Sequence, residues 1–303
     1  MAFSCCSSKT AKRIGSFTSV LDGNGNGPEG LPTFEDILLG NVPDEPWRPQ
    51  TFLEFLHVER NDENMFFYEE VEAFKASQGK TAKTPPDELL ILPKDVRKDP
   101  VQYSQKIIET FVKESAPKQV NISDEQRKRL LGDAVQSTLE AQGYEPEIFE
   151  EAQTEVRRLM QLDSWPRFRK KMLTQNIMKA DSMGRLYEGA FFLLLTLLGA
   201  GLILGLQPSR FYLFILIFPV YFMYEDFVTY QMSFCVRNAM KGLRDRFGKN
   251  HEKSIIVCPI TKASQKHMMR RVFAVIVGST ILTVGFFFAL SFIIEAGVGR
   301  TLY

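Results

Sequence analysis

The stretch that decides the fold of this chain is FEEAQTEVRRLMQLDSWPRF, which runs from Phe149 to Phe168. Asp163 and Ser164, followed by an aromatic residue and Pro166, predict that one helix ends and a second begins there. The first half carries an apolar stripe at helical spacing, with charged residues opposite: Phe149, Ala152, Val156, Leu159 and Met160. Such a stripe alone is typical of a helix packed into a core, so its wider meaning depends on the sequence around it.

Two further motifs lie upstream. ENMFFY runs from Glu63 to Tyr68, and VNIS runs from Val120 to Ser123. With FEEAQ and LMQLDSWPRF, and in this order, they resemble the signatures of the RGS domain, the regulator of G-protein signalling. The resemblance covers about Leu31 to Lys171 and departs from the family at Tyr68, where Trp is usual. A Pro-rich segment at 76–100, expected to be a loop longer than the family norm, could alter which partner fits.

The resemblance implies an all-α fold, with an RGS-type helical bundle over residues 31–175. Family members bind the GTP-bound Gα subunit and hold its switch loops in the transition state, so the chemistry belongs to Gα and the chain itself is not an enzyme. Asn121 would reach toward the catalytic Gln of Gα, and Arg167 would hold Asp163 as an acceptor for a switch-loop Thr. The residues carried over as Gα-binding are Glu63, Asn64, Asn121, Leu159, Asp163, Ser164 and Arg167. Each polar one could instead cap a helix, shape a turn or face solvent.

The first 30 residues are rich in Ser, Gly, Lys and Asn and are expected to form a flexible tail without a cleaved signal peptide. Cys5 and Cys6 are possible lipidation sites, or unmodified thiols with equal weight. The three histidines are scattered, and no phosphate loop, nucleophile elbow or metal-ligand spacing occurs. We therefore expect no metal, no cofactor and no nucleic-acid partner.

Residues 188–303 change character to long apolar runs, which predict about three transmembrane helices at 188–209, 211–231 and 272–294. Glu225 and Asp226 interrupt the second run and are expected near the headgroups, paired with basic residues. Residues 232–271 form a basic loop that lies against anionic lipids or serves topology alone, and 295–303 form a C-terminal tail. The charge distribution places the RGS half and the basic loop in the cytoplasm. A re-entrant first hairpin with one true span gives the same sidedness.

Gly201 and Gly205 form a small-xxx-small pattern that could support a helix–helix oligomer. Together these features predict an integral membrane GTPase-activating protein for Gα, which shortens receptor signalling, with the plasma membrane favoured over an internal one. The order of domains is similar to that of fungal membrane RGS proteins of the bud-site-selection type.

The alternative function is an RGS-fold scaffold that marks a cortical site without stimulating GTP hydrolysis. A channel or transporter is disfavoured, since three spans with so few buried polar residues make a poor pathway. The sequence leaves open which Gα is served and the oligomeric state.

Overall fold

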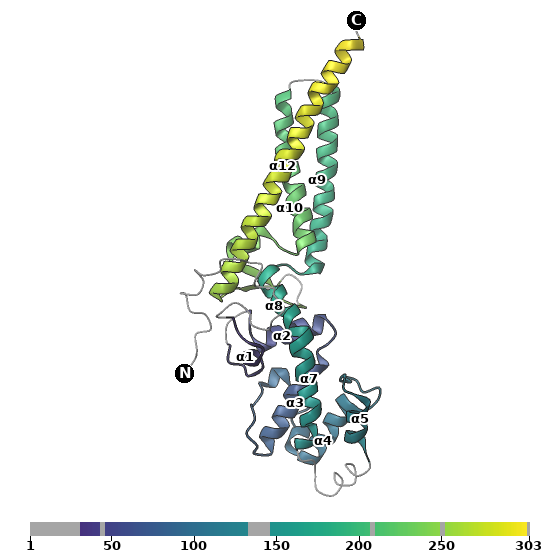
Figure 1. The fold of residues 1–303 in the computed structure, drawn as a ribbon, viewed down its shortest axis with the longest axis vertical. Coiled ribbons are helices and arrows are strands. Elements are labelled where there is room, and N and C mark those ends of the chain that lie inside the picture. Colours follow the sequence, from purple (N-terminus) through teal and green to yellow (C-terminus); the bar gives the residue numbers. More distant parts are fainter. Residues whose placement is uncertain (1–30, 43–45, 133–145, 207–209, 249–251, 302–303) are drawn as a thin grey trace. The chain divides into compact units, whose positions relative to one another are not determined.

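The computed structural model describes residues 31–42, 46–132, 146–206, 210–248 and 252–301 of the 303-residue chain. The described part divides into two compact units, 31–170 and 171–301. Both are helical apart from two three-residue strands, so the predicted all-α class is confirmed. Cys5 and Cys6 lie outside the described residues (Figure 1).

Side-chain caps explain where three helices of the first unit start. Thr33 opens α1 with a reciprocal capping box, and Ser123 opens α5 in the same way. Asp99 caps α4, which has Pro100 at its first position. The helices are α1 (Phe34–Leu38), α2 (Pro49–Val58), α3 (Glu63–Ser77), α4 (Pro100–Ile107), α5 (Asp124–Leu131), α7 (Glu150–Leu159) and α8 (Trp165–Thr174). Shorter helical turns are η3 (Asp87–Leu89), η4 (Val96–Lys98), η5 (Ile108–Val112), η6 (Pro146–Phe149) and η7 (Met160–Ser164).

The predicted break at Asp163 and Ser164 is wrong. Residues Met160–Ser164 form a π-helical turn, η7, that joins α7 to α8 without interruption. A wider turn keeps Met160, Ser164, Trp165 and Phe168 all buried, which a cap in extended conformation would not do. The helical stripe itself is confirmed, because Phe149, Ala152, Val156 and Met160 are buried and Leu159 is half-buried.

Aromatic rings make up much of the core of this unit. Trp47 packs edge-on to Trp165 and Phe168 at ring-centroid distances of 5.9 and 5.7 Å. Phe67 contacts Phe111 and Phe149, so the FEEAQ motif meets the ENMFFY motif in the core. Each such ring pair adds about 1 kcal/mol beyond its area burial.

The Pro-rich segment predicted as a loop is held against α3 at two points. Lys83 Nζ lies 3.0 Å from Glu69 Oε1 and also donates to the carbonyl of Leu38. The next residue of α3, Glu70, accepts 2.7 Å hydrogen bonds from the backbone N–H groups of Ile91 and Leu92. Because both carboxylates are buried, these contacts fix the segment to α3.

The second unit contains three long apolar helices, with α10 lying against both α9 and α12 (Figure 1). They are α9 (Lys179–Leu206), α10 (Ile217–Met232, preceded by η8, Arg210–Leu216) and α12 (Pro259–Thr301). By length and composition, three stretches of the described chain could cross a membrane: Lys179–Leu206, Phe211–Met232 and Pro259–Ala296. Their outer surfaces expose large apolar side chains such as Leu202, Phe218 and Leu282.

Two glycines of α9 allow close packing against η8 and α10. A Cβ at Gly189 would lie 3.0 Å from the ring of Phe227, and one at Gly199 would lie 2.9 Å from Leu216 Cδ2. Gly201 and Gly205, the predicted oligomer pair, would meet no described atom within 4 Å. The packing glycines inside this unit are therefore different from the pair that the sequence pattern selected.

Most of the segment 232–271, predicted as a basic loop, is folded in the described residues. It contains α11 (Val236–Lys241) and an antiparallel pair, β1 (Leu243–Asp245) and β2 (Lys253–Ile255), in which Leu243 lies opposite Ile255. α12 already begins at Pro259, so the four last basic residues of the segment are helical: Lys262, Lys266, Arg270 and Arg271. Phe234, Ile256 and Cys258 of this segment are buried.

Asn176 holds this folded segment together. Its side chain donates to the carbonyl of Cys235 at 2.9 Å and accepts from the N–H of Cys235 at 2.7 Å. Its backbone carbonyl accepts from the N–H of Asp245 at 3.1 Å. A single buried amide thus connects the residues before α9 with the start of α11 and with β1.

Candidate functional site

Two long-range contacts bring three distant segments together at the N-terminus of α3. Asn61 Nδ2 donates to Ser164 Oγ at 3.0 Å, which joins this N-terminus to the π-helical turn. Lys118 Nζ lies 2.8 and 3.0 Å from the two carboxylate oxygens of Asp62, which joins it to the segment before the VNIS turn. The three motifs found in the sequence therefore meet in one region of the first unit.

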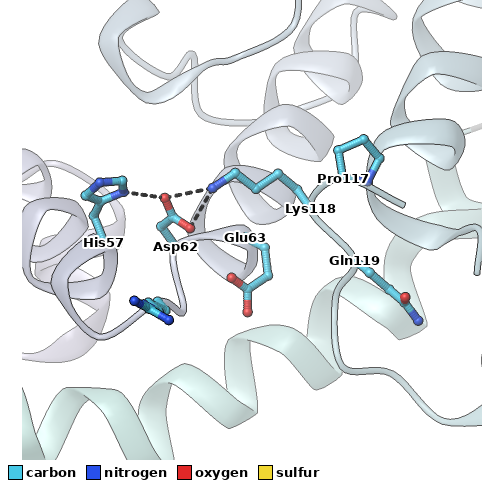
Figure 2. A pocket seen from close by; sticks show the side chains of 7 residues that line it. His57, Asp62, Glu63, Pro117, Lys118 and Gln119 are labelled. Atoms are coloured by element: carbon cyan, nitrogen blue, oxygen red, sulfur yellow. Dashed lines mark hydrogen bonds and ion pairs between the residues drawn. The ribbon is translucent and has the colours of Figure 1, made fainter. Parts of the chain in front are cut away.

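A hollow of about 390 Å³ opens beside the N-terminus of α3. Figure 2 shows Asp62 between His57 and Lys118, with Glu63 turned toward the same space. Burial raises the pKa of Asp62, but hydrogen bonds from His57 at 2.8 Å and from Lys118 outweigh it and lower the pKa overall. The Asp62 carboxylate is therefore held in place in its charged form, and its charge is already paired with that of Lys118.

Glu63 is the remaining carboxylate of the hollow. Burial raises the pKa of its side chain above the ordinary value, against the opposing effect of a hydrogen bond from its own backbone. An incoming cationic or hydrogen-bond-donating group would stabilise its charged form. This geometry fits the contact predicted for Glu63 from the sequence.

Asp163 is exposed on the π-helical turn and is held as the sequence predicts. Arg167 Nη2 lies 2.7 Å from Asp163 Oδ2, one turn apart along the chain. Sequence reasoning missed a third member, Glu59, whose Oε2 lies 2.9 Å from Arg167 Nη1. Arg167 thus connects the end of α2 with Asp163 and restricts where that carboxylate can point.

Asn64 and Ser164 are not exposed contacts in the free chain. Asn64 is 3 % exposed and Ser164 is fully buried, and both are linked through Asn61, to which Asn64 Nδ2 donates. Asn64 and Ser164 therefore hold the N-terminus of α3 against the π-helical turn. Sequence reasoning missed Asn61, because a polar residue in a turn carries no local sign of a partner 103 residues away.

Asn121 is exposed between two buried neighbours, Val120 and Ile122. The alternation anchors the VNIS turn from both sides and presents the amide outward. Its side chain makes no hydrogen bond to the part of the chain that the structure describes, so its donor and acceptor remain available. Leu159, on α7, is half-buried and adds apolar surface.

Comparison with known proteins defines the class of this unit. Residues 41–177 match the family model described as "Regulator of G protein signaling domain". The chain therefore contains an RGS domain, as the three motifs predict.

Two curated relatives are similar to a part of this chain. "Regulator of G-protein signaling rgs-7" of Caenorhabditis elegans is 33% identical over 129 residues, which is 43% of this chain and 13% of that protein. "Regulator of G-protein signaling 13" of Homo sapiens is 22% identical over 152 residues, 48% of this chain and 80% of that protein. The chain thus spans only a small part of the first relative, and most of the second.

Proposed function

We propose that this chain is a membrane-anchored GTPase-activating protein for Gα subunits. The observation that carries the proposal is the convergence of three segments at the N-terminus of α3, through Asn61 with Ser164 and Asp62 with Lys118. Around it, Glu63, Asn121 and Asp163 keep polar groups available to a partner. The RGS family supplies the partner class, a Gα subunit with GTP bound.

The proposed mechanism is preorganisation of the partner, because the chain supplies no reacting group. Asp163, held by Arg167, accepts a hydrogen bond from a switch-loop hydroxyl or amide without rearranging first. Asn121 offers a donor and an acceptor near the catalytic Gln of Gα without a charge to desolvate. Hydrolysis accelerates because these contacts favour the transition-state arrangement over the ground state.

Anchoring would place this activity where its partner resides. The three apolar helices of the second unit support insertion into a bilayer, since their outer surfaces expose large apolar side chains. Confinement to the membrane plane raises the effective concentration of the chain toward lipid-anchored Gα. We place the RGS domain in the cytoplasm and favour the plasma membrane, where the protein would shorten receptor signalling.

Single-turnover GTP hydrolysis tests the activity directly. The full chain in detergent micelles is mixed with purified GTP-loaded Gα subunits, and phosphate release is followed. We expect acceleration that falls on the order of tenfold with Asn121→Ala, as for loss of one oriented hydrogen bond. Gln102→Ala, an exposed amide on α4, is the matched control and should keep full acceleration. No acceleration of any Gα by a folded chain would overturn the proposal.

The scaffold alternative makes a different prediction in a binding experiment. A GTPase activator binds Gα with a transition-state analogue of the γ-phosphate more tightly than Gα with a non-hydrolysable GTP analogue. A scaffold, including one of the bud-site type, would bind both forms equally and leave hydrolysis unchanged. The availability of Asn121 and Asp163 favours the activator.

A further inference from the structure

A second hollow, of about 660 Å³, lies where the charged beginning of α9 passes into its apolar part. It is formed within the second unit by α9, α10 and α11. Its walls combine two arginines, Arg185 and Arg237, with phenylalanines of α9 and α10. Such a junction of charged and apolar walls is where the headgroup of a lipid meets its acyl chains in a bilayer.

Each arginine is fixed by a buried carboxylate. Arg185 Nη1 lies 3.1 Å from Asp226, which is 3 % exposed, and Arg237 Nε lies 3.2 Å from Glu225, which is 5 % exposed. These pairs match the predicted pairing of both carboxylates with basic residues. They hold the two guanidinium groups rigidly without using all of their donors.

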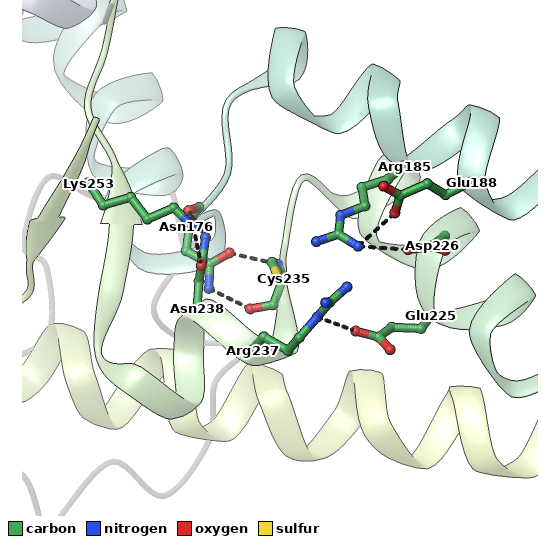
Figure 3. Close-up of polar contacts among 9 residues, drawn as sticks. All are labelled: Asn176, Arg185, Glu188, Glu225, Asp226, Cys235, Arg237, Asn238 and Lys253. Carbon is green, nitrogen blue, oxygen red and sulfur yellow. Dashed lines mark hydrogen bonds and ion pairs between the residues drawn. The ribbon is translucent and has the colours of Figure 1, made fainter. Parts of the chain in front are cut away.

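The unused donors point into the same space. Among the described residues, Nε and Nη2 of Arg185 and both terminal nitrogens of Arg237 have no hydrogen-bond acceptor. Figure 3 shows the two guanidinium groups, from α9 and α11, turned toward one another. Two converging planar guanidinium groups with free N–H donors suit a phosphate, which accepts several hydrogen bonds at once.

The apolar wall continues from this polar end. Phe192 and Phe222 stack with ring centroids 5.4 Å apart, and Phe191 lies 5.6 Å from Phe192. Phe191 is 61 % exposed despite its size. An acyl chain on these rings would cover exposed apolar surface, which a free phosphate or a soluble headgroup could not do.

The charge of the hollow selects the headgroup. Two guanidinium groups stand with three carboxylates, because Glu188 also pairs with Arg185 at 2.9 Å. The excess of one negative charge disfavours a purely anionic lipid and favours a headgroup that carries a cation beside its phosphate. Glu188 is exposed and can accept hydrogen bonds from a primary ammonium group.

We propose that this hollow binds a phospholipid of the phosphatidylethanolamine class. The phosphate accepts hydrogen bonds from Arg185 and Arg237, the ammonium donates to Glu188, and an acyl chain lies on Phe191 and Phe222. The site rests on the proposed membrane anchoring. It is independent of the Gα-contact region in the first unit.

Lipid retention tests the site with the full chain. The protein is incubated in micelles with equal amounts of phosphatidylethanolamine and phosphatidylcholine, which share their charges but differ in ammonium N–H donors, and bound lipid is counted by native mass spectrometry. We expect preferential retention of phosphatidylethanolamine. Arg237→Gln and Phe191→Ala should each lower it on the order of tenfold. Leu197→Ala, an exposed apolar residue of α9 outside the hollow, should leave it unchanged.

Further variants keep the test decisive. Arg237→Lys retains a cation for Glu225 if Arg237→Gln fails to fold, and it should still weaken retention, because the planar fork is lost. Glu188→Ala should remove the preference over phosphatidylcholine. Equal retention of both lipids by the wild type, or retention unaffected by these variants, would overturn the proposal. Recovery of the protein from cells without detergent would instead overturn anchoring, and the lipid site with it.

Discussion

The side-chain amide of Asn61 donates a 3.0 Å hydrogen bond to the hydroxyl of Ser164, 103 residues further along the chain. The contact joins the N-terminus of α3 to the π-helical turn that presents Asp163. Asn61→Ala leaves the buried hydroxyl of Ser164 without this donor, so we expect a loss of about 1–2 kcal/mol in unfolding free energy. Both tryptophans, Trp47 and Trp165, lie in the first unit, so urea unfolding followed by tryptophan fluorescence reports on this unit alone.

The same variant should also lower the acceleration of GTP hydrolysis, because Asp163 loses part of its support. Asn41→Ala, an exposed asparagine after α1, serves as the control. Unchanged stability together with unchanged acceleration in Asn61→Ala would contradict the role given to this contact.

Glu59 pairs with Arg167, which in turn pairs with Asp163. We therefore expect Glu59→Gln to reduce the acceleration of GTP hydrolysis severalfold in the wild type and to have no further effect in Arg167→Ala. A double-mutant cycle on single-turnover rates measures this coupling. The stability coupling should be about 0.5–1 kcal/mol, because the arginine is half exposed. Additive effects of the two substitutions would show that Glu59 acts by another route.

The Glu69 carboxyl gives the first unit a pH-dependent stability. Burial raises its pKa to about 7, against the opposing effect of Lys83. A raised pKa means that the folded state favours the protonated form. The contribution to stability is therefore full below the unfolded value of 4.5 and is lost as the pH rises toward 7. We expect the unfolding free energy to fall over this window by up to about 3 kcal/mol from this group.

Glu69→Gln should flatten that dependence, whatever it does to the stability at a single pH. Urea unfolding of both proteins at several pH values between 4.5 and 7.5, read by tryptophan fluorescence, gives the two slopes. Glu147→Gln, at an exposed carboxylate paired with Lys80, should leave the slope over this window unchanged. Parallel slopes for wild type and Glu69→Gln would contradict the prediction.

Gly189 and Gly201 lie on the same helix but in different surroundings. Gly189→Ala places a Cβ 3.0 Å from the ring of Phe227, so α9 and α10 must move apart, at a cost of about 1–3 kcal/mol. Gly201→Ala meets no described atom within 4 Å and should leave the thermal stability of the protein in micelles unchanged or slightly raised. If Gly201→Ala instead changes the mass of the particle in solution, the predicted oligomer through Gly201 and Gly205 gains support.

Asn176 holds Cys235, one of two buried cysteines of the second unit, by two hydrogen bonds. Cys235 and Cys258 are 3 % and 1 % exposed, so both should resist a maleimide in the folded protein, in a background where Cys5 and Cys6 are serine. Asn176→Ala removes both side-chain hydrogen bonds to Cys235 and should speed its labelling at least tenfold by releasing the start of α11. Asn238→Ala removes a neighbouring amide with a longer, 3.4 Å hydrogen bond and should have a smaller effect. Equal labelling rates would show that Asn176 does not hold the segment.

The sequence predicted what depends on neighbours along the chain. Helical spacing located the buried stripe from Phe149 to Met160. Runs of apolar residues located the three helices long enough to cross a membrane. The three motifs, taken in order, predicted the RGS domain that the family model matches. These features are local, so a few consecutive residues are enough to predict each of them.

Tertiary structure alone decided which of those residues meet. Asp163 and Ser164 have the local chemistry of a cap, yet the burial of Trp165 and Phe168 keeps the helix continuous through them. Asn61 and Asn176 look like ordinary turn residues, and only the packing of distant segments makes each a connection. The basic segment folds because Phe234 and Ile256 have apolar neighbours to pack against, which charge alone did not predict. The pairing of buried polar groups is set by three-dimensional proximity, and a linear pattern does not encode it.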